Sequence, residues 1–345
     1  MKATKKKPKG DNKGELSEGY AIFYILLNNE IPFLDSRLIN KKNSIKITEI
    51  AENNFVSVVR INNDKTISVL SKDMTLIRSL PVSEIITNEL LQTFLTDIIT
   101  KAKPSLDIEG IKKKLNIKKL KGSSYMKSDV LISFTQLGIK YDALKGLSIK
   151  SYLGANSTLL NASTQTNFIF RVNGFQGSEV DTNKIETNSK VMDRFLDIIK
   201  KNGVFKFVRC ESEVFENNLR MVDSLMPELL SKILLERYFA GKTHLNELIK
   251  DSIDKIHIIS LLKAAAFGMF PSREWDGLYQ AKGFIVVKND GDVGIFHLLE
   301  EAYLNDYLFN HTYIETASTS RHGFGELFYE DGVLLFKLNC QLRLS

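Results

Sequence analysis

Two short apolar stretches of the sequence each carry a charged side chain where a strand is expected. Asp129 opens the stretch 129–134, and Lys150 lies near the end of the stretch 146–152. Ser148 precedes Lys150 by two residues, so the two side chains share one face of an extended strand. If the two stretches pair as neighbouring strands, Asp129 lies close to Lys150.

Two glutamates near the N-terminus extend this set. Glu15 and Glu18 are three residues apart in a helix expected over residues 14–28, so they are neighbours on one side of it. Carboxylates are hard ligands for Mg²⁺, which neutralises charge on a phosphate. A lysine beside the metal positions the attacking water or helps to deprotonate it. The set predicts Mg²⁺-dependent phosphodiester hydrolysis, with Lys150 assisting the water and Asp129 and a helix glutamate as metal ligands. Glu18 is preferred because it lies deeper in the helix.

Three longer stretches carry a resemblance to a known family. They are "NKGELSEGYAIFYILL", "GLSIKSYLGANSTLLNASTQTNFIFRV" and "ETASTSRHGFGELFYEDGVLLFKLNCQLRL", near the start, the middle and the end of the chain. Each is similar to a segment of the HpaII family of type II restriction endonucleases, and they occur in the same order. The succession of helix glutamate, strand aspartate and strand lysine likewise resembles the PD-(D/E)XK nuclease superfamily.

The resemblance implies Mg²⁺-dependent cleavage of double-stranded DNA that leaves 5′-phosphate ends, and the namesake of the family cuts within CCGG. A cognate DNA methyltransferase is then the functional partner. A palindromic target favours a homodimer, because two-fold protein symmetry mirrors the site. A monomer that nicks each strand in turn is the alternative.

One position departs from the superfamily pattern. Ser148 stands where an aspartate or glutamate normally precedes x-Lys, although a serine there is usual in the HpaII family. A neutral hydroxyl is a poor ligand for Mg²⁺. The helix glutamates, or Asp142 in the expected connecting loop, would complete the site, which holds one or two metal ions.

Polar side chains after the expected catalytic strand are candidates for DNA contact. Asn and Gln suit bidentate contacts to adenine, and Arg in the segment 318–323 suits guanine. A polar surface loop explains the composition of residues 156–167 equally well. The predicted DNA-binding residues are Ser148, Ser151, Asn156, Asn161, Gln165, Asn167, Ser320, Arg321 and His322.

The remaining patterns predict a mixed α and β protein. A third strand is expected at residues 166–172, and a helix over residues 83–101 with Ser83 as its N-cap. An Asp-Gly pair between apolar runs predicts a hairpin in each of the segments 283–299 and 325–344. We expect an α+β fold with a PD-(D/E)XK restriction-endonuclease-like core, in which helices flank a central mixed sheet, with N-terminal and C-terminal elaborations.

The expected organisation has three parts. Residues 1–13 form a disordered basic tail, and residues 14–180 form the catalytic nuclease core. A segment over about residues 30–110 is inserted in that core, and its role is not evident from the sequence. Residues 181–345 supply a helical region and the C-terminal hairpins, which complete the fold and the DNA cleft.

Basic charge is concentrated in two segments of a chain whose net charge is +6. Residues 1–13 hold six lysines against one aspartate, and residues 101–121 hold eight lysines against two acidic residues. Such segments are typical of a phosphate-binding surface, although many lysine-rich helices simply expose their lysines to solvent.

Several classes of protein are excluded by the sequence. No apolar run approaches the roughly 20 residues of a membrane helix, and no apolar core follows the N-terminal lysines as in a signal peptide. Cys210 and Cys340 lie too far apart for a zinc motif and are too few for a disulfide framework. We expect a cytoplasmic protein that has no membrane partner.

Two other functions stay open at this point. One is a structure-selective DNA repair or recombination nuclease of the same superfamily. The other is a non-catalytic DNA-binding protein in which Ser148 marks a lost site, and which binds DNA in a salt-dependent manner without cleaving it.

Overall fold

The computed structural model describes residues 13–53, 56–118, 126–154 and 156–345, without the side chain of residue 142. The basic tail expected over residues 1–13 therefore lies outside the described residues, except for Lys13. The chain forms two compact units. The first unit comprises Met1–Asn156 and Gln280–Leu304, and the second comprises Ser157–Tyr279 and Asn305–Ser345.

This division corrects the domain boundaries expected from the sequence. Strand β9 (Asn167–Asn173), expected in the catalytic core, lies in the second unit. Strands β11 (Gly283–Val287) and β12 (Val293–His297), expected in the C-terminal region, belong to the first. The cause is a parallel pairing of β11 with β7 (Ile139–Ser151) across a long stretch of chain, which no local pattern reveals.

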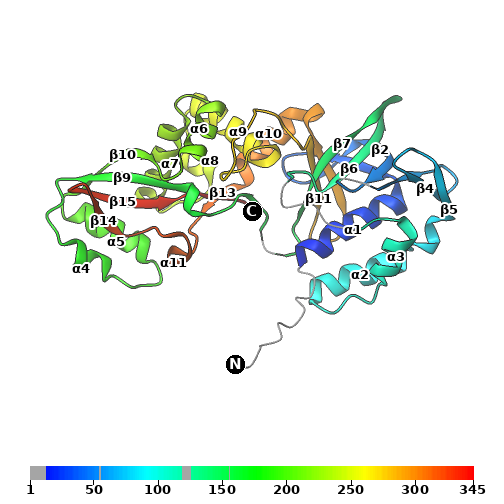
Figure 1. The fold of residues 1–345 in the computed structure, drawn as a ribbon, viewed down its shortest axis with the longest axis horizontal. Coiled ribbons are helices and arrows are strands. Elements are labelled where there is room, and N and C mark those ends of the chain that lie inside the picture. The colour runs from blue at the N-terminus through cyan, green and yellow to red at the C-terminus, as the bar shows by residue number, and fades with distance from the viewer. Residues whose placement is uncertain (1–12, 54–55, 119–125, 155) are drawn as a thin grey trace. The chain divides into compact units, whose positions relative to one another are not determined.

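The first unit is built on a nine-stranded mixed sheet (Figure 1) in the order β1-β12-β11-β7-β6-β2-β3-β4-β5, and β1 also pairs with β2. The segment expected as an insertion at about residues 30–110 therefore supplies strands of the central sheet itself. The long-range partners of these strands, such as β12 for β1 and β6 for β2, follow from no local pattern. The further strands are β1 (Glu30–Leu34), β2 (Asn40–Ala51), β3 (Ser57–Ile61), β4 (Thr66–Ser71), β5 (Leu76–Pro81) and β6 (Val130–Gln136).

Helix α1 (Lys13–Asn28) packs on this sheet and confirms the helix expected near the N-terminus. The Phe23 ring lies 5.8 Å from that of Phe94 in α2 (Asn88–Thr100), so α1 is held between the sheet and α2 (Figure 1). The hydroxyl of Tyr20 donates to the carbonyl of Gly291 at 2.7 Å and ties α1 to the turn between β11 and β12. These contacts fix the helix that carries the two glutamates.

The start of α2 differs from the expectation. Its N-cap is Thr87, whose side chain accepts the backbone N–H of Leu90, and not Ser83. Ser83 lies in the separate short turn η1 (Val82–Glu84). Both residues suit an N-cap by type, and the choice between them depends on where the chain leaves β5. The basic segment that follows contains the short helix α3 (Ile108–Leu115).

The second unit contains a four-stranded sheet, β10-β9-β15-β14, and a three-stranded sheet, β13-β16-β8. The two hairpins expected from the Asp-Gly pairs are confirmed. Strand β11 pairs with β12 in the first unit, and β14 pairs with β15 in the second. The strands are β8 (Thr158–Leu160), β10 (Val204–Cys210), β13 (Thr312–Glu315), β14 (Leu327–Glu330), β15 (Val333–Asn339) and β16 (Gln341–Leu344).

The second unit also contains helices. Its helices are α4 (Glu179–Asn183), α5 (Lys190–Lys200), α6 (Glu213–Val222), α7 (Met226–Ala240), α8 (Leu245–Leu248), α9 (Ser252–Phe267) and α11 (Thr319–His322), and α10 (Glu301–His311) begins in the first unit. Cys210 and Cys340 are free and buried. Among the described residues, no helix combines the length and the apolar character needed to span a bilayer.

Candidate active site

Asp129 is positioned by the antiparallel pairing of β6 with β7. Val130 is paired with Leu147, and the backbone N–H of Asp129 donates to the carbonyl of Leu147 at 2.8 Å. The pairing therefore sets Asp129 beside the part of β7 that carries Ser148 and Lys150, as the two sequence stretches predicted. Asp142, expected in a connecting loop, instead lies within β7, because the hairpin turns at Leu137 and Gly138.

One oxygen of the Asp129 carboxylate is held by two donors from β7. Its Oδ2 atom accepts the backbone N–H of Ile149 at 2.7 Å and the hydroxyl of Ser148 at 3.0 Å. Among the residues the structure describes, no donor is found for Oδ1. The carboxylate is thus fixed in orientation with one oxygen available to a ligand.

The role of Ser148 follows from these contacts. It is only 3% exposed and uses its hydroxyl on Asp129, so the expectation that it touches DNA is corrected. In place of the missing carboxylate of the superfamily pattern, it orients the carboxylate of the neighbouring strand. The backbone N–H of Ile149 does the same, and no side-chain pattern could have revealed it.

Burial and charge act in opposite directions on Asp129 and Lys150. Burial raises the pKa of Asp129, although the Lys150 ammonium, the Ile149 N–H and the Ser148 hydroxyl each lower it in part. Burial lowers the pKa of Lys150, and the charges of Asp129 and Glu18 partly restore it. Each group therefore makes the charged form of the other less costly.

The structure distinguishes the two helix glutamates. Glu18 is half-buried in α1, and its charge acts on Lys150. Glu15 lies in the first turn of the helix, where a carboxylate complements the helix dipole. Glu18 is thus the glutamate whose charge acts on Lys150.

A glycine and a second lysine complete the surroundings of Asp129. A Cβ added at Gly146 would lie 2.7 Å from the Cβ of Ser128 and 2.7 Å from the carbonyl oxygen of Gln280. Only glycine lets β7 approach the residue before Asp129 so closely. The charge of Lys127 also lowers the pKa of Asp129. Sequence reasoning missed Lys127, although its place two residues before Asp129 was a usable signal.

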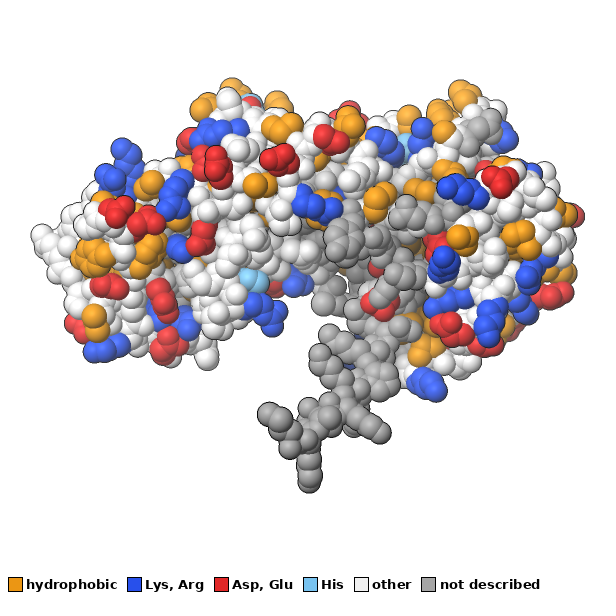
Figure 2. Space-filling model, in the orientation of Figure 1, with side chains coloured by type: hydrophobic (Ala, Val, Ile, Leu, Met, Phe, Trp, Pro, Cys, Tyr) orange, Lys and Arg blue, Asp and Glu red, His pale blue; other side chains and the backbone are white. Residues whose placement is uncertain are grey.

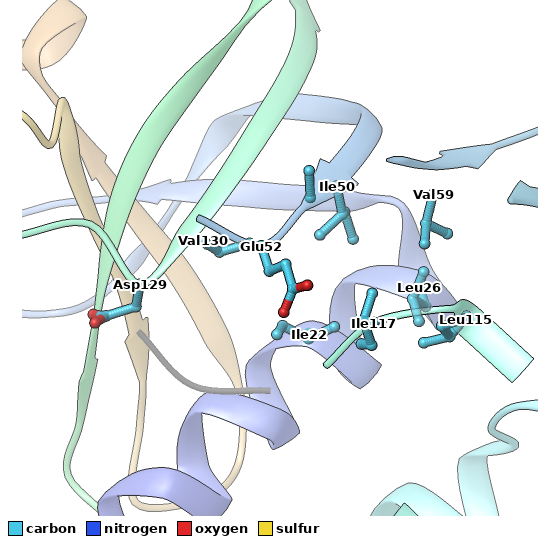
Figure 3. A pocket seen from close by; sticks show the side chains of 10 residues that line it. Ile22, Leu26, Ile50, Glu52, Val59, Leu115, Ile117, Asp129 and Val130 are labelled. Atoms are coloured by element: carbon cyan, nitrogen blue, oxygen red, sulfur yellow. The ribbon is translucent and has the colours of Figure 1, made fainter. Parts of the chain in front are cut away.

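Asp129 also lines a small cavity within the first unit (Figure 3). It has a volume of about 20 Å³, room for about one water. Its lining is apolar except for Asp129 and Glu52, which follows the end of β2. In Figure 3 the Asp129 carboxylate points away from Glu52, whose own carboxylate is directed towards Ile22 of α1. Glu52 therefore does not converge on the same point as Asp129.

The expected DNA-binding residues divide between the two units. Ser151 and Asn156 lie in the first unit, and Asn161, Gln165, Ser320, Arg321 and His322 lie in the second. Asn156, Asn161, Ser320 and Arg321 are exposed, while Ser151, Gln165 and His322 are half-buried. Their exposure is compatible with DNA contact.

Asn167 is the exception, and its expected DNA contact is corrected. Its side chain is fully buried, and its amide nitrogen donates to Glu211 at 2.7 Å and to the carbonyl of His322 at 2.8 Å. It therefore fixes the backbone of the segment that carries Arg321 and His322. Burial together with the Arg321 charge lowers the pKa of His322.

The structure describes the basic segment 101–121 as far as Lys118. In Figure 2, Lys and Arg side chains gather over the end of the first unit that carries α2 and α3, with acidic side chains among them. Lys112 pairs with Glu109 at 2.6 Å, and the amine of Lys114 donates to a backbone carbonyl. Part of the basic charge is thus engaged within the protein, which weakens the argument for a phosphate-binding surface at this segment.

The donor set fits a hard divalent cation that keeps open positions. The described residues contain no group of three or more His, Cys, Asp or Glu side chains that could hold a metal ion. Mg²⁺ is commonly bound by one or two carboxylates together with waters and substrate phosphate oxygens. Asp129 offers an oxygen for such a site, and Glu18 on the helix is another carboxylate whose charge acts on Lys150.

An oriented strand carboxylate, a half-buried strand lysine and a helix glutamate are groups that could hold a metal ion and act on a phosphate. The profile of the HpaII restriction endonuclease family matches residues 12–344. The chain is 29% identical over 361 residues to the type II restriction enzyme HpaII of Haemophilus parainfluenzae, covering 96% of this chain and 98% of that protein. No solved structure matches the chain. The chain belongs to the HpaII restriction endonuclease family and is a restriction endonuclease.

Proposed function

We propose that this restriction endonuclease is of type II and hydrolyses phosphodiester bonds of double-stranded DNA with Mg²⁺, leaving 5′-phosphate ends. Family membership along almost the whole chain supports the activity. The observation that carries the chemistry is the carboxylate of Asp129, oriented by Ser148 and Ile149 beside Lys150.

The residues of the site have separate roles in this proposal. Asp129 and Glu18 hold the metal ion, which when bound neutralises charge on the phosphate and activates water. Lys150 holds the attacking water and opposes the negative charge that develops on the phosphate. Because burial lowers its pKa, the amine of Lys150 exchanges a proton more readily than that of an exposed lysine. Ser148 keeps Asp129 in place.

The arrangement of elements supports a PD-(D/E)XK core. Strands β6 and β7 are antiparallel, β11 runs parallel to β7, and α1 packs on this part of the sheet. The aspartate and the lysine then lie on adjacent strands, and the glutamate lies on the helix that covers them. The rest of the sheet and the second unit are elaborations of that core.

The target and the partners are proposed from the resemblance to the family. CCGG is the first sequence to test. A cognate DNA methyltransferase protects the host at that target, and a homodimer suits a palindrome. Arg321 is the exposed arginine available for guanine in such a site.

The test is digestion of unmethylated phage DNA by the purified protein in Mg²⁺ or in EDTA. Wild-type protein is expected to give discrete fragments in Mg²⁺ alone, with 5′-phosphate ends whose sequences identify the target. Lys150→Ala is expected to lower the cleavage rate by about 10²–10⁴-fold, the range for loss of a group that assists proton transfer, while DNA binding persists. Lys140→Ala, in the same strand, is the control.

Each alternative function predicts a different pattern of DNA cleavage and binding on a gel. A smear, or preference for flaps and junctions, would favour a structure-selective nuclease over a restriction enzyme. DNA that is shifted but never cut at any Mg²⁺ concentration would leave a DNA-binding protein with a lost site. Discrete fragments produced equally well by Lys150→Ala would contradict the assignment of the catalytic lysine.

A further inference from the structure

A polar cavity of about 470 Å³ lies within the second unit, which does not include the sheet that carries Asp129. It is lined by the start of α5, by α7 and by the segment that leads into α11. Its volume is far above what an ordered water needs. The hydroxyl side chains of its lining are Thr187, Ser189, Tyr238, Thr316, Ser318 and Thr319.

The one guanidinium in this lining is Arg237, which is only 8% exposed. Its Nε donates to the carbonyl of Ile314 at 3.2 Å, and its Nη2 donates to the hydroxyl of Thr316. The guanidinium also interacts with the Tyr238 hydroxyl and lies 4.7 Å from the centre of the Tyr238 ring, and all of these partners are neutral. Among the described residues, Arg237 has no carboxylate partner within ion-pairing distance. A buried charge without a counter-ion is costly, so most buried charges in proteins are paired.

A second buried arginine in the same unit shows the usual solution. Arg194 is fully buried and forms ion pairs with Glu186 at 2.7 Å and with Glu326 at 3.3 Å. The unit thus neutralises one buried guanidinium with its own carboxylates and leaves the other facing a cavity. The difference indicates that the counter-ion of Arg237 comes from a ligand.

The other charges around the cavity do not supply that counter-ion. Lys190 is paired with Glu186 at 3.0 Å, and Asp193, held by the Thr187 hydroxyl, is not part of the lining. Ser189 precedes α5 and makes no side-chain cap, so backbone N–H groups of the first turn add to the positive potential. The cavity offers donors and one positive charge without a carboxylate partner among the described residues, the chemistry that recognises a phosphate or a similar oxyanion.

We propose that this cavity binds a backbone phosphate of the DNA substrate. The lining residues Thr316–Thr319 run directly into Ser320 and Arg321, which are exposed and include the arginine suited to guanine. A duplex read by that segment presents its sugar-phosphate backbone to adjacent donors, and such contacts fix the register of a protein on DNA. The inference rests on the proposed function, because it takes DNA as the substrate.

The test uses the full chain in two measurements. Inorganic phosphate is the probe in the first, a thermal unfolding titration in which wild-type protein is expected to gain in Tm with increasing phosphate. Arg237→Gln removes the charge and is expected to abolish this gain. Because Arg237→Gln can lower stability by itself, Ser318→Ala is the milder second variant, with a weakened gain expected. Arg194→Gln is the matched control that loses a buried guanidinium and keeps the phosphate response.

The second measurement is DNA binding as a function of salt, in Ca²⁺ to prevent cleavage. One lost phosphate contact lowers the slope of log K against log salt by about 0.9. Arg237→Gln is expected to show that decrease and about tenfold weaker binding, with Arg194→Gln unchanged in slope. An unchanged slope would overturn the proposal, and an unchanged slope with a lost phosphate response would mean that the cavity takes only a free anion.

Failure of this inference is distinguishable from failure of the proposed function. Sequence-specific cleavage by wild-type protein in Mg²⁺ tests the proposed function alone and does not depend on Arg237. If cleavage occurs and the phosphate response is absent in wild type, only the phosphate cavity is refuted.

Discussion

The carboxylate of Asp129 accepts the backbone N–H of Ile149 at 2.7 Å, and Ile149 immediately precedes Lys150. The bond links the proposed metal ligand on β6 to the backbone that carries the proposed catalytic lysine on β7. Since the two strands are also paired at Val130 and Leu147, the relative position of Asp129 and Lys150 is set by strand pairing together with this bond from the main chain to the carboxylate. Such preorganisation is what catalysis by positioning requires.

Ser148→Ala is predicted to raise the Mg²⁺ concentration needed for half-maximal cleavage. The substitution removes one of the two donors that orient Asp129, and loss of a group that orients a metal ligand typically costs about 10–100-fold in metal affinity. The measurement is the cleavage rate over a Mg²⁺ titration. Ser57→Ala, which removes another buried serine of the first unit, is the control and is expected to leave the Mg²⁺ requirement unchanged.

Glu18→Gln and Glu15→Gln are predicted to separate the two helix glutamates. Loss of the Glu18 charge removes a proposed metal ligand and one of the charges that act on Lys150, so a decrease of about 10²-fold or more in cleavage rate is expected. Glu15→Gln is expected to change the rate little, because a first-turn glutamate contributes to the helix dipole. Equal losses in both variants, measured at saturating DNA, would contradict this assignment.

Arg321→Ala is predicted to weaken binding to the target sequence more than binding to random DNA. A bidentate contact to guanine contributes about 1–3 kcal/mol of discrimination, which is about 5–150-fold in affinity. The measurement is competition binding in Ca²⁺. Arg209→Ala is the control, because that arginine is paired with Glu330 at 2.8 Å on the surface of the same unit. A uniform loss on both DNAs would indicate a phosphate contact by Arg321.

The stability of the protein is predicted to fall between pH 6.5 and pH 4 because of His297. This residue is buried, its Nδ1 accepts the Leu299 N–H at 3.1 Å, and its Nε2 has no hydrogen-bond partner among the described residues. Burial, reinforced by Lys145 and Lys282, lowers its pKa from 6.5 to about 4. The folded state therefore takes up the proton later than the unfolded state as the pH falls.

The sign and size of this effect follow from linkage. Above pH 6.5 neither state is protonated, so the full stability is present, and it is lost as the pH falls towards the folded-state pKa of about 4. The loss in the free energy of unfolding amounts to about 3 kcal/mol. Urea unfolding at pH 7 and pH 4 is the measurement. His297→Gln is expected to lose less stability over that interval, and an equal loss in both proteins would contradict the prediction.

The local elements of this protein could be predicted from its sequence. The helix at α1, the strands β6 and β7 and the two Asp-Gly hairpins each depend on periodicity or turn chemistry within a short stretch. The residue types of the site were evident for the same reason. Mg²⁺ chemistry calls for carboxylates and a lysine, and few places in the chain offer them in that order.

The tertiary structure alone decided what those residues do together. The pairing of β11 with β7 joins segments far apart in the chain, so no local sequence pattern predicts the boundary between the units. Ser148 and Asn167 have the residue types of DNA contacts but are buried with their hydrogen bonds used inside the protein. Burial and partners depend on long-range packing, and that is why a side chain's type indicates its chemistry while only the fold decides whether it faces a ligand.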